Sequence, residues 1–368
     1  MNTFIKYFGI STIATFCAVM VSYFFLGGVA GASNTLLLGV LETSLSFDNA
    51  VVNATKLAET NARGRKWFLS WGVLIAVFGM RLIFPVVIVA IVSGLAPWTV
   101  VDMALTHPAE YAAILTSSHQ LVAGFGGAFL FMVFLKFMFN EEKDTYWLSW
   151  IEAPLAKAGS IDMAQSLVTI ALIVITAYTL IPAPEQVAFM VSGLAGWGSY
   201  VLVEGLGNKL EAYDESHASN TKAVLNTTLR AALPALLYLE VLDASMSFDG
   251  VIGAFALSTN IFVIMLGLGI GALFVRSMTV LLVDKGTLTE FRYLEHGAFW
   301  AIGALATTMF LGTHYRLPEW FIGSIGALAI GAALVSSIRA NRQDAKGEAS
   351  VEVGLPSGQV VEVKDSDL

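Results

Sequence analysis

Residues 35–56, TLLLGVLETSLSFDNAVVNATK, hold the peptide SFDN (46–49) in the middle of a long apolar run. A carboxylate is expensive in hydrocarbon, so acidic residues inside membrane helices are rare and usually functional. A near-copy, SFDG (247–250), lies in a second apolar run later in the chain. Two Asp residues in near-copies of one motif predict an internal duplication with one site between its halves.

The composition indicates a membrane protein. Of the 368 residues, 56% are hydrophobic and 13% are charged, with a mean hydropathy of +0.73, whereas a typical soluble domain is about 25% charged. The net charge of −8 argues against nucleic-acid binding. Cys17 is the only cysteine, which excludes an intramolecular disulfide and a thiolate metal cluster. Because no catalytic triad, nucleophile elbow or phosphate loop is evident, we expect neither an enzyme nor a permanently bound cofactor.

Ten segments are long and apolar enough to cross a bilayer, which takes roughly 20 residues each. Cytoplasmic loops are enriched in Lys and Arg. With the N-terminus inside, all but four of the 20 basic residues fall on the inner side; Arg316 falls outside, and Arg81, Lys136 and Arg276 lie within spans. We therefore predict an all-α, polytopic transmembrane bundle in the inner membrane with both termini cytoplasmic. The predicted spans are 7–29, 35–56, 67–95, 121–139, 164–183, 185–206, 231–257, 261–283, 297–313 and 318–338.

Several parts of this topology stay open. The small residues at 30–32 resemble a cleavage site, so a removable signal peptide is the alternative for the first span. The fifth and sixth spans are separated only by residues 181–184, and one re-entrant hairpin is the alternative there. Residues 99–120 are too polar to span and predict an outer loop with a short helix. Residues 339–368 predict a charged, solvated cytoplasmic tail.

The two motif copies belong to a longer repeat. Further along each copy, Gly72 and Arg81 have the same separation as Gly267 and Arg276. With the two arginines and the four motif positions aligned below, the match includes five polar positions inside apolar segments. Aligning Asp48 with Asp249 places Glu42 on Asp243, Ser44 on Ser245 and Ser46 on Ser247.

The repeat predicts an inverted architecture. The motif spans are the second and the seventh, so they cross the membrane in opposite directions. A 5 + 5 inverted repeat places its site near the bilayer midplane, between the halves. We accordingly divide the chain into a first repeat (1–160), a fifth span with the second repeat (161–338) and the tail (339–368).

The polar residues of the two motif helices are all oxygen donors. Residues three, four or seven apart share a helix face, and sets of oxygen ligands suit hard cations such as Mg²⁺, Ca²⁺ or Mn²⁺. The first helix predicts a stripe of Glu42, Ser46 and Asn49 with Ser44 and Asp48 beside it, and the second a stripe of Glu240, Asp243 and Ser247 with Ser245 and Asp249 beside it.

The charges of this set do not balance. Five carboxylates face only two guanidinium groups, those of Arg81 and Arg276, which leaves three negative charges. In a low-dielectric environment such an excess is removed by protonation or by a bound cation. Competition between protons and a divalent ion for one set of carboxylates would couple the two fluxes. The alternative is that each Arg pairs with an acid only to hold helices together.

The duplicated motif resembles that of the TerC family of integral membrane proteins, within the wider LysE-like transporter superfamily. The resemblance rests on Glu42 followed by SFDNA (46–50), a mid-span Arg, and the second copy beginning at Asp243, and it covers roughly residues 35–338. TerC-like proteins are linked to tellurium resistance, and relatives export manganese. The resemblance implies that Glu42, Asp48, Asp243 and Asp249 are cation-site carboxylates. Gly250 stands where the family usually has Asn.

We therefore expect a transporter that exports a divalent cation, with Mn²⁺ as the first candidate, in exchange for protons. Its partners would be the lipid bilayer and a small inorganic ion, and a homo-oligomer is possible. One alternative is an exporter of a small organic solute or oxyanion that uses Arg81 and Arg276 as anion partners. Another is a non-transporting membrane partner in a metal- or tellurium-stress complex, with the tail and the basic loop at 63–66 as contact surfaces.

Overall fold

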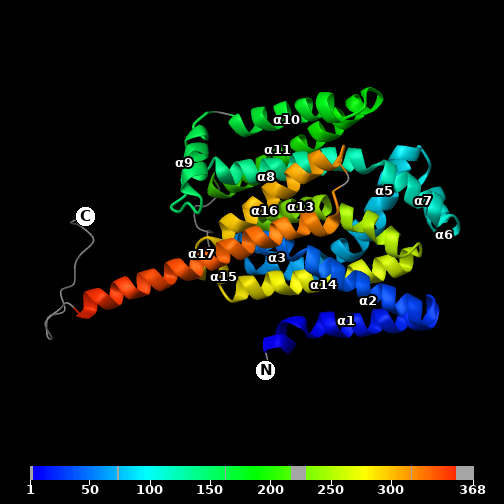
Figure 1. The fold of residues 1–368 in the computed structure, drawn as a ribbon, viewed down its shortest axis with the longest axis horizontal. Helices are drawn as coiled ribbons and strands as arrows, with labels where there is room; N and C mark the ends of the chain where they lie inside the picture. Colours follow the sequence, from blue (N-terminus) through cyan, green and yellow to red (C-terminus); the bar gives the residue numbers. More distant parts are fainter. Residues whose placement is uncertain (1–2, 73, 162, 217–228, 316, 354–368) are drawn as a thin grey trace.

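The computed structural model describes residues 3–72, 74–161, 163–216, 229–315 and 317–353, and these residues form helices joined by turns (Figure 1). The prediction of an all-α protein is therefore confirmed. Many of the helices lie along one common direction, as in a membrane bundle (Figure 1). The α-helices before the middle of the chain are α1 (Thr3–Phe25), α2 (Gly28–Leu45), α3 (Phe47–Glu59), α4 (Ala62–Trp67), α5 (Phe84–Ser93), α6 (Pro97–Thr106), α7 (Pro108–Ser117), α8 (His119–Met138) and α9 (Ser149–Ala158). Those that follow are α10 (Ala164–Leu180), α11 (Gln186–Ser216), α13 (Leu229–Leu257), α14 (Ile261–Asp284), α15 (Thr287–Glu290), α16 (Leu294–Gly312) and α17 (Glu319–Val353).

The chain is a multi-pass membrane protein by the length and hydropathy of its helices. Over the described residues, 6 helices are long and apolar enough to cross a membrane, or 7 if the bent pair α2–α3 is one span. Three further predicted spans, at α10, α13 and α16, are helical but do not meet this criterion over their described residues, so the ten-span count is not established. The 6 helices are Phe4–Phe25, Ile75–Ser93, His119–Met138, Ala183–Lys209, Ile261–Asp284 and Phe321–Asp344.

The predicted second span is not one continuous helix. α2 ends at Leu45, α3 begins at Phe47, and their axes differ by 55°. The break falls at Ser46, whose φ of −97° and ψ of 21° leave the helical region, although its N–H still donates to Glu42 O at 2.9 Å. The prediction that residues 42–49 share the faces of one straight helix is therefore wrong beyond Ser46.

The third predicted span changes its helix type along its length. After α4, the backbone forms π-helical segments at Phe68–Gly72 (η1) and Ile75–Ile83 (η2) before α5 resumes the α-helix and ends at Gly94. In a π-helix the backbone hydrogen bonds join residues five apart rather than four, and such turns occur often at functional sites. The predicted span 67–95 therefore alternates between two helix types, α and π.

The structure describes three other parts of the predicted topology. α10 and α11 are separate helices joined by a short 3₁₀ turn, Ala183–Glu185. Segment 99–120, which we predicted to be an outer loop with one short helix, contains most of α6, all of α7 and the start of α8. The predicted tail begins as a continuation of α17, which ends at Val353, and residues 354–368 lie outside the described part.

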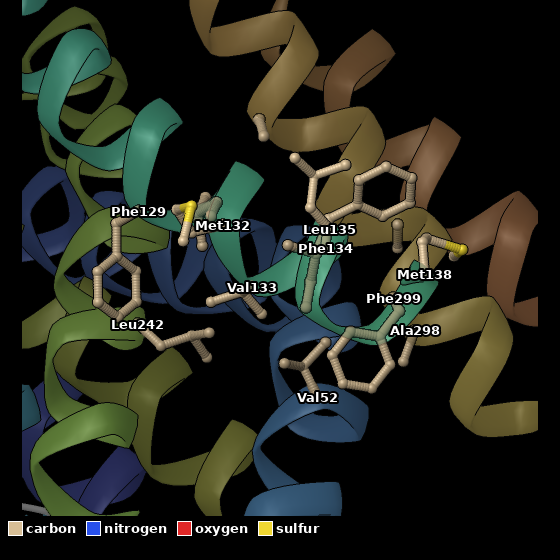
Figure 2. Packing of buried hydrophobic residues seen from close by; sticks show 14 of the residues in the cluster. Val52, Phe129, Met132, Val133, Phe134, Leu135, Met138, Leu242, Ala298 and Phe299 are labelled. Atoms are coloured by element: carbon tan, nitrogen blue, oxygen red, sulfur yellow. The ribbon is translucent and has the colours of Figure 1, made fainter. Parts of the chain in front are cut away.

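The main apolar core surrounds α8, which lies in the middle of the bundle. Of the apolar stretch of α8 that is long enough to span a membrane, 67% is buried, whereas only 11% of the corresponding stretch of α1 is buried. Helix α8 is therefore interior and α1 peripheral. Figure 2 shows Phe129, Met132 and Val133 of α8 packed near Leu242 of α13 and Val52 of α3. The same cluster includes Ala298 and Phe299 of α16, so α8 connects the helices of both halves of the chain.

Helices α2 and α14 approach each other closely through glycines. A Cβ added at Gly267 would lie 2.5 Å from Leu38 Cβ, and one at Gly39 would lie 2.9 Å from Ile270 Cγ2. Small residues allow such close contact between membrane helices. At Gly271 an added Cβ would overlap the side chain of Glu42. The position of Glu42 is therefore set partly by a glycine on the facing helix.

We expect Gly271→Ala to destabilise the protein by about 1–3 kcal/mol, because the new methyl group must displace Glu42 or separate α2 from α14. The measurement is denaturant-induced unfolding of the purified protein in detergent. Gly198→Ala in α11 is the matched control, since nothing lies within 4 Å of its added Cβ. If both variants unfold like the wild type, the close contact at Gly271 is not present in solution.

Candidate functional site

A cavity lies beside the break between α2 and α3, near the middle of that bent segment. Its volume is about 60 Å³, whereas about 10–15 Å³ holds one water molecule, so it has room for a partly hydrated ion. Its polar wall consists of Glu42, Ser46, Asp48 and Asn49, all within one turn of the break. The rest of the wall comes from α2, α13, α16 and α17 through Leu45, Met246, Gly250, Leu305, Ile322 and Gly323.

Asp48 is a buried acid in the first turn of α3. Its side chain accepts the backbone N–H of Asn49 at 3.0 Å, and among the described residues no Lys, Arg or His forms an ion pair with it. The amino end of a helix favours a negative charge, but one such end does not replace the solvation that the carboxylate loses on burial. The backbone of α17 approaches it closely, since a Cβ added at Gly326 would lie 2.8 Å from Asp48 Oδ2.

Glu42 has a fixed basic partner. Arg81 Nη2, from the π-helical η2, donates to Glu42 Oε1 at 2.5 Å, and both side chains are buried. Arg81 Nη1 also donates to the carbonyl oxygen of Ala76 at 2.7 Å. One oxygen of Glu42 is therefore held by Arg81 while the residue as a whole lines the cavity.

Gly250, which stands where the first motif has Asn49, faces the side chain of Glu42. A Cβ added at Gly250 would lie 2.9 Å from Glu42 Oε2. An asparagine there would therefore collide with the free oxygen of Glu42. A larger residue at position 250 would therefore require the end of the Glu42 side chain to move.

A second acidic group lies on α13. Arg276 Nη2 of α14 is 3.4 Å from Glu240 Oε1, and its Nη1 donates to the carbonyl of Phe68 in η1 at 3.1 Å. Asp243 also lies near enough to Arg276 to interact with its charge. Three buried oxygens of this face, Glu240 Oε2, Asp243 Oδ2 and Ser247 Oγ, have no hydrogen-bond partner among the described residues.

The structure does not gather all predicted ligands at one point. Among the described residues, no three Asp, Glu, His or Cys side chains converge closely enough to hold a metal ion. Glu42 and Asp48 share the cavity, whereas Asp243 is not among its lining residues. The side chain of Asp249 lies outside the described part of the chain, although its backbone belongs to α13. The single four-carboxylate centre is thus not assembled in the described residues.

Two predicted serines lie away from the cavity wall. Ser44 is exposed and donates to the carbonyl of Val40 in its own helix at 2.8 Å. Ser44 and Asp48 do not share one helix face, because the helix breaks between them at Ser46. Ser245 likewise donates to Val241 O at 2.9 Å. Both serines satisfy their own helices and hold no ligand position here.

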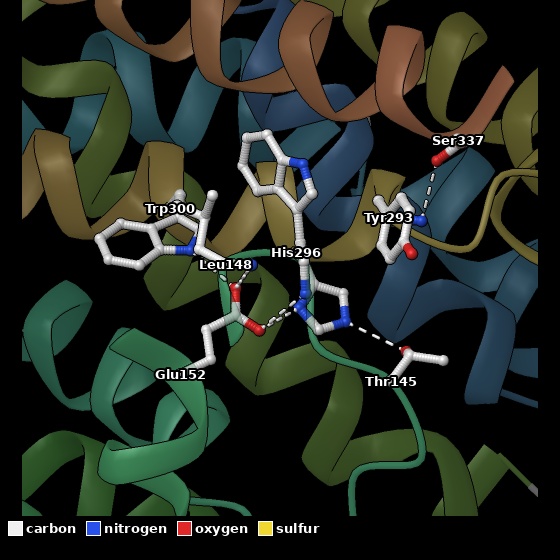
Figure 3. Close-up of polar contacts among 8 residues, drawn as sticks. Thr145, Leu148, Glu152, Tyr293, His296, Trp300 and Ser337 are labelled. Carbon is white, nitrogen blue, oxygen red and sulfur yellow. Dashed lines mark hydrogen bonds and ion pairs between the residues drawn. The ribbon is translucent and has the colours of Figure 1, made fainter. Parts of the chain in front are cut away.

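A buried polar cluster that the sequence reasoning missed lies at another part of the bundle (Figure 3). Glu152 of α9 is 0% exposed, and it accepts the backbone N–H groups of Trp147 and Leu148. His296 Nδ1 lies 2.8 Å from Glu152 Oε2, and Trp300 Nε1 donates to Oε1 at 2.9 Å. The one available signal is that His296 and Trp300 are four residues apart and share a helix face.

The pKa of Glu152 is set by these contacts. Burial alone would raise it, but hydrogen bonds from His296, Trp300 and the Leu148 backbone, with the charge of His296, lower it from 4.5 to about 2. Since the folded pKa lies below the unfolded one, the stabilisation is complete above pH 4.5 and is lost as the pH falls towards 2. The neighbouring Lys143 has its pKa lowered by burial, an effect that Glu152 and Glu295 partly offset.

We expect the stability difference between the wild type and Glu152→Gln to depend on pH. It should be constant above about pH 5, at about 3 kcal/mol, and shrink between pH 4.5 and pH 2. Unfolding in detergent at a series of pH values measures it. Glu110→Gln, at an exposed acid of α7, should show no such pH dependence. A difference that persists at pH 2 would show that the ionised carboxylate is not what stabilises this cluster.

Comparisons with known proteins locate the chain in a family. A family model described as a protein of unknown function (DUF475) matches residues 47–344, from the first motif to the end of the membrane part. The TerC family gave no match, so the resemblance of the paired motifs is not supported at the family level. No curated protein and no solved structure matched the chain.

Proposed function

The chain belongs to the DUF475 family, and we propose that it is an ion transporter of the inner membrane that moves a divalent cation in exchange for protons. Mn²⁺ is the first candidate, because the proposed ligands are oxygens of carboxylate, hydroxyl and amide groups. Outward transport is part of the proposal and rests on the TerC-like motifs alone. The proposal also keeps the ten-span, 5 + 5 inverted arrangement.

The observation that carries the proposal is Asp48. It is buried in the middle of a membrane segment, borders a cavity and has no ion-pair partner among the described residues. A buried carboxylate in that position must take up a proton or a cation. Glu42 Oε2, Ser46 and Asn49 line the same cavity and provide further oxygen donors. A cation and a proton would therefore compete for Asp48, which is the basis of the proposed exchange.

The broken helix supports transport rather than a static metal site. Transporters with inverted repeats typically bind substrate and ions at discontinuous helices near the midplane. Here the break at Ser46 lies beside the cavity, and the π-helical segments η1 and η2 hold both arginines through backbone carbonyls. Each half of the chain has one buried Glu–Arg pair, Glu42–Arg81 and Glu240–Arg276. The two arginines are equivalent in the repeat and each pairs with a buried glutamate, although Glu240 lies one turn before the position that aligns with Glu42.

The proposed topology has both termini on the cytoplasmic side. Lys6 at the start of α1 lies 3.4 Å from Asp284 at the end of α14, so these two ends share one side of the bundle, as the predicted topology requires. Figure 1 places α9 and α15 at one end of the bundle, and α6 and α7 at the other. This separation agrees with the predicted inner and outer loops.

The alternative of anion export has less support. Both guanidinium groups that would bind an oxyanion already donate to a carboxylate and to a backbone carbonyl. An anion would have to displace Glu42 or Glu240 from a buried pair, which costs several kcal/mol. Two of the three unpartnered groups described on the α13 face are carboxylate oxygens, which repel an anion when they are ionised.

Cation-driven proton movement in proteoliposomes tests the proposal. The protein is reconstituted with a pH-sensitive dye inside the vesicles, and Mn²⁺ is added outside. We expect Mn²⁺ entry to drive protons outwards in a protein-dependent way, with Ca²⁺, Mg²⁺ and Zn²⁺ compared in parallel. A correctly folded protein that moves none of these ions would overturn the proposal, and movement of tellurite instead would favour the anion exporter.

A further inference from the structure

Helix α9 is fastened to the bundle mainly through one carboxylate. Of its residues, Glu152 and Ala156 are buried, whereas Trp150 is 76% exposed. The four groups that contact the Glu152 carboxylate are two backbone N–H groups, the indole N–H of Trp300 and Nδ1 of His296. Because an ionised carboxylate only accepts hydrogen bonds, all four act as donors. The Glu152 side chain therefore joins α9 to α16, and each of its four partners donates a hydrogen bond to the negatively charged carboxylate.

The same end of α16 is also fixed to α17. The backbone N–H of Tyr293, which precedes α16, donates to Ser337 Oγ of α17 at 2.9 Å (Figure 3). A Cβ added at Gly297 would lie 2.5 Å from Ala333 Cβ, so the two helices are in close contact one turn later. Helices α9, α16 and α17 are thus joined within a short distance of Glu152.

Helix α16 extends from this junction to the cavity. A Cβ added at Gly303 would lie 2.6 Å from Phe134 Cδ2, so α16 also packs tightly against α8. Two residues further, Leu305 lines the cavity together with Ile322 and Gly323 of α17. Part of the cavity wall therefore belongs to α16 and α17, the two helices held by the contacts of Glu152 and Ser337.

We propose that Glu152 is a positioning residue that holds the α16–α17 wall of the cavity closed towards the end of the bundle where α9 lies. Release of α9 frees α16 and opens the cavity to that end, which is cytoplasmic in the proposed topology. The proposal rests on the proposed function, because it assigns the cavity to a transported ion. Glu152 itself touches no ion.

Side-specific labelling tests this inference without requiring transport. In a Cys17→Ser background, Leu305→Cys places one thiol in the cavity wall, since Cys17 is the only native cysteine. A membrane-impermeant maleimide is added to oriented vesicles from each side. In Glu152→Gln the new amide N–H₂ faces only donors, so we expect labelling from the α9 side to become at least about tenfold faster. Labelling from the opposite side should not accelerate.

Further variants separate this role from general loosening. Trp300→Phe removes one donor and leaves a smaller aromatic ring in its place, so it should give a smaller increase on the same side. It also provides the test if Glu152→Gln does not fold. Glu110→Gln, at an exposed acid of α7, should leave both rates unchanged. Equal acceleration from both sides, or none, would overturn the inference. One-sided acceleration in a protein that moves no cation would support the positioning role and contradict the proposed function.

Discussion

Asp48→Asn is expected to reduce divalent-cation flux by at least about 100-fold while leaving the protein as stable as the wild type. The substitution keeps the size of the side chain and one oxygen, but it removes the negative charge that faces the cavity. Because the buried carboxylate has no ion-pair partner among the described residues, its removal breaks no ion pair there and lowers a desolvation cost. The measurement is Mn²⁺ uptake by proteoliposomes, with unfolding in detergent recorded alongside.

Two comparisons make this result specific. Asp102→Asn changes the same residue type at an exposed position of α6 and should keep full flux. Gly326→Ala brings a methyl group to within 2.8 Å of Asp48 Oδ2 and should lower flux without changing any charge. If Asp48→Asn transports like the wild type, Asp48 is not a ligand. If it loses flux only together with stability, its role is structural.

The second large effect is expected at the buried pair of Glu42 and Arg81. Arg81→Gln leaves Glu42 buried without a counter-charge, so we expect a loss of about 3–5 kcal/mol in the free energy of unfolding. Glu42→Gln should be costly for the same reason, since it isolates Arg81. The double variant should recover much of the loss, because an amide pair carries no unbalanced charge. Denaturant titration of the four proteins gives the coupling energy directly.

The exposed pair Lys136–Glu204 provides the matched control for this cycle. Its atoms are 2.6 Å apart, but the side chains are 53% and 30% exposed. Lys136→Gln should therefore cost no more than about 1 kcal/mol. A double variant whose loss equals the sum of the two single losses would show that Glu42 and Arg81 contribute independently and are not a coupled pair.

Much of the site was predictable because charge in hydrocarbon is a strong signal. Glu42, Asp48 and Asn49 stand out in an apolar run, and the structure places all three at one cavity. The partner of each arginine was harder to predict. The repeat aligns Asp243 with Glu42, yet Arg276 contacts Glu240, one helical turn earlier. The axial shift and rotation between two packed helices decide which of two acids, one turn apart, pairs with an arginine. The spacing of residues in the sequence does not contain this information.

The break at Ser46 was missed although its residue types favour it. Ser, Asp and Asn bond to nearby backbone groups and are common where helices begin. The same residues were interpreted as ligands on a straight helix, which misplaced Ser44. The π-helical turns have no such local signal. Arg81 bonds to the carbonyl of Ala76 nearby, but the carbonyl of Phe68 is bonded by Arg276, which comes from a distant part of the chain. The Glu152–His296 contact joins positions too far apart in the chain for any local pattern.

Direct binding of Mn²⁺ is the measurement that tests the central claim, that the cavity at the α2–α3 break is a cation site. The free-ion signal in electron paramagnetic resonance is followed while purified protein in lipid nanodiscs is titrated. The wild type and Asp102→Asn should show one saturable site that weakens as the pH falls, and Asp48→Asn should show none. Equal binding by all three proteins, or no binding by the wild type, would contradict the account.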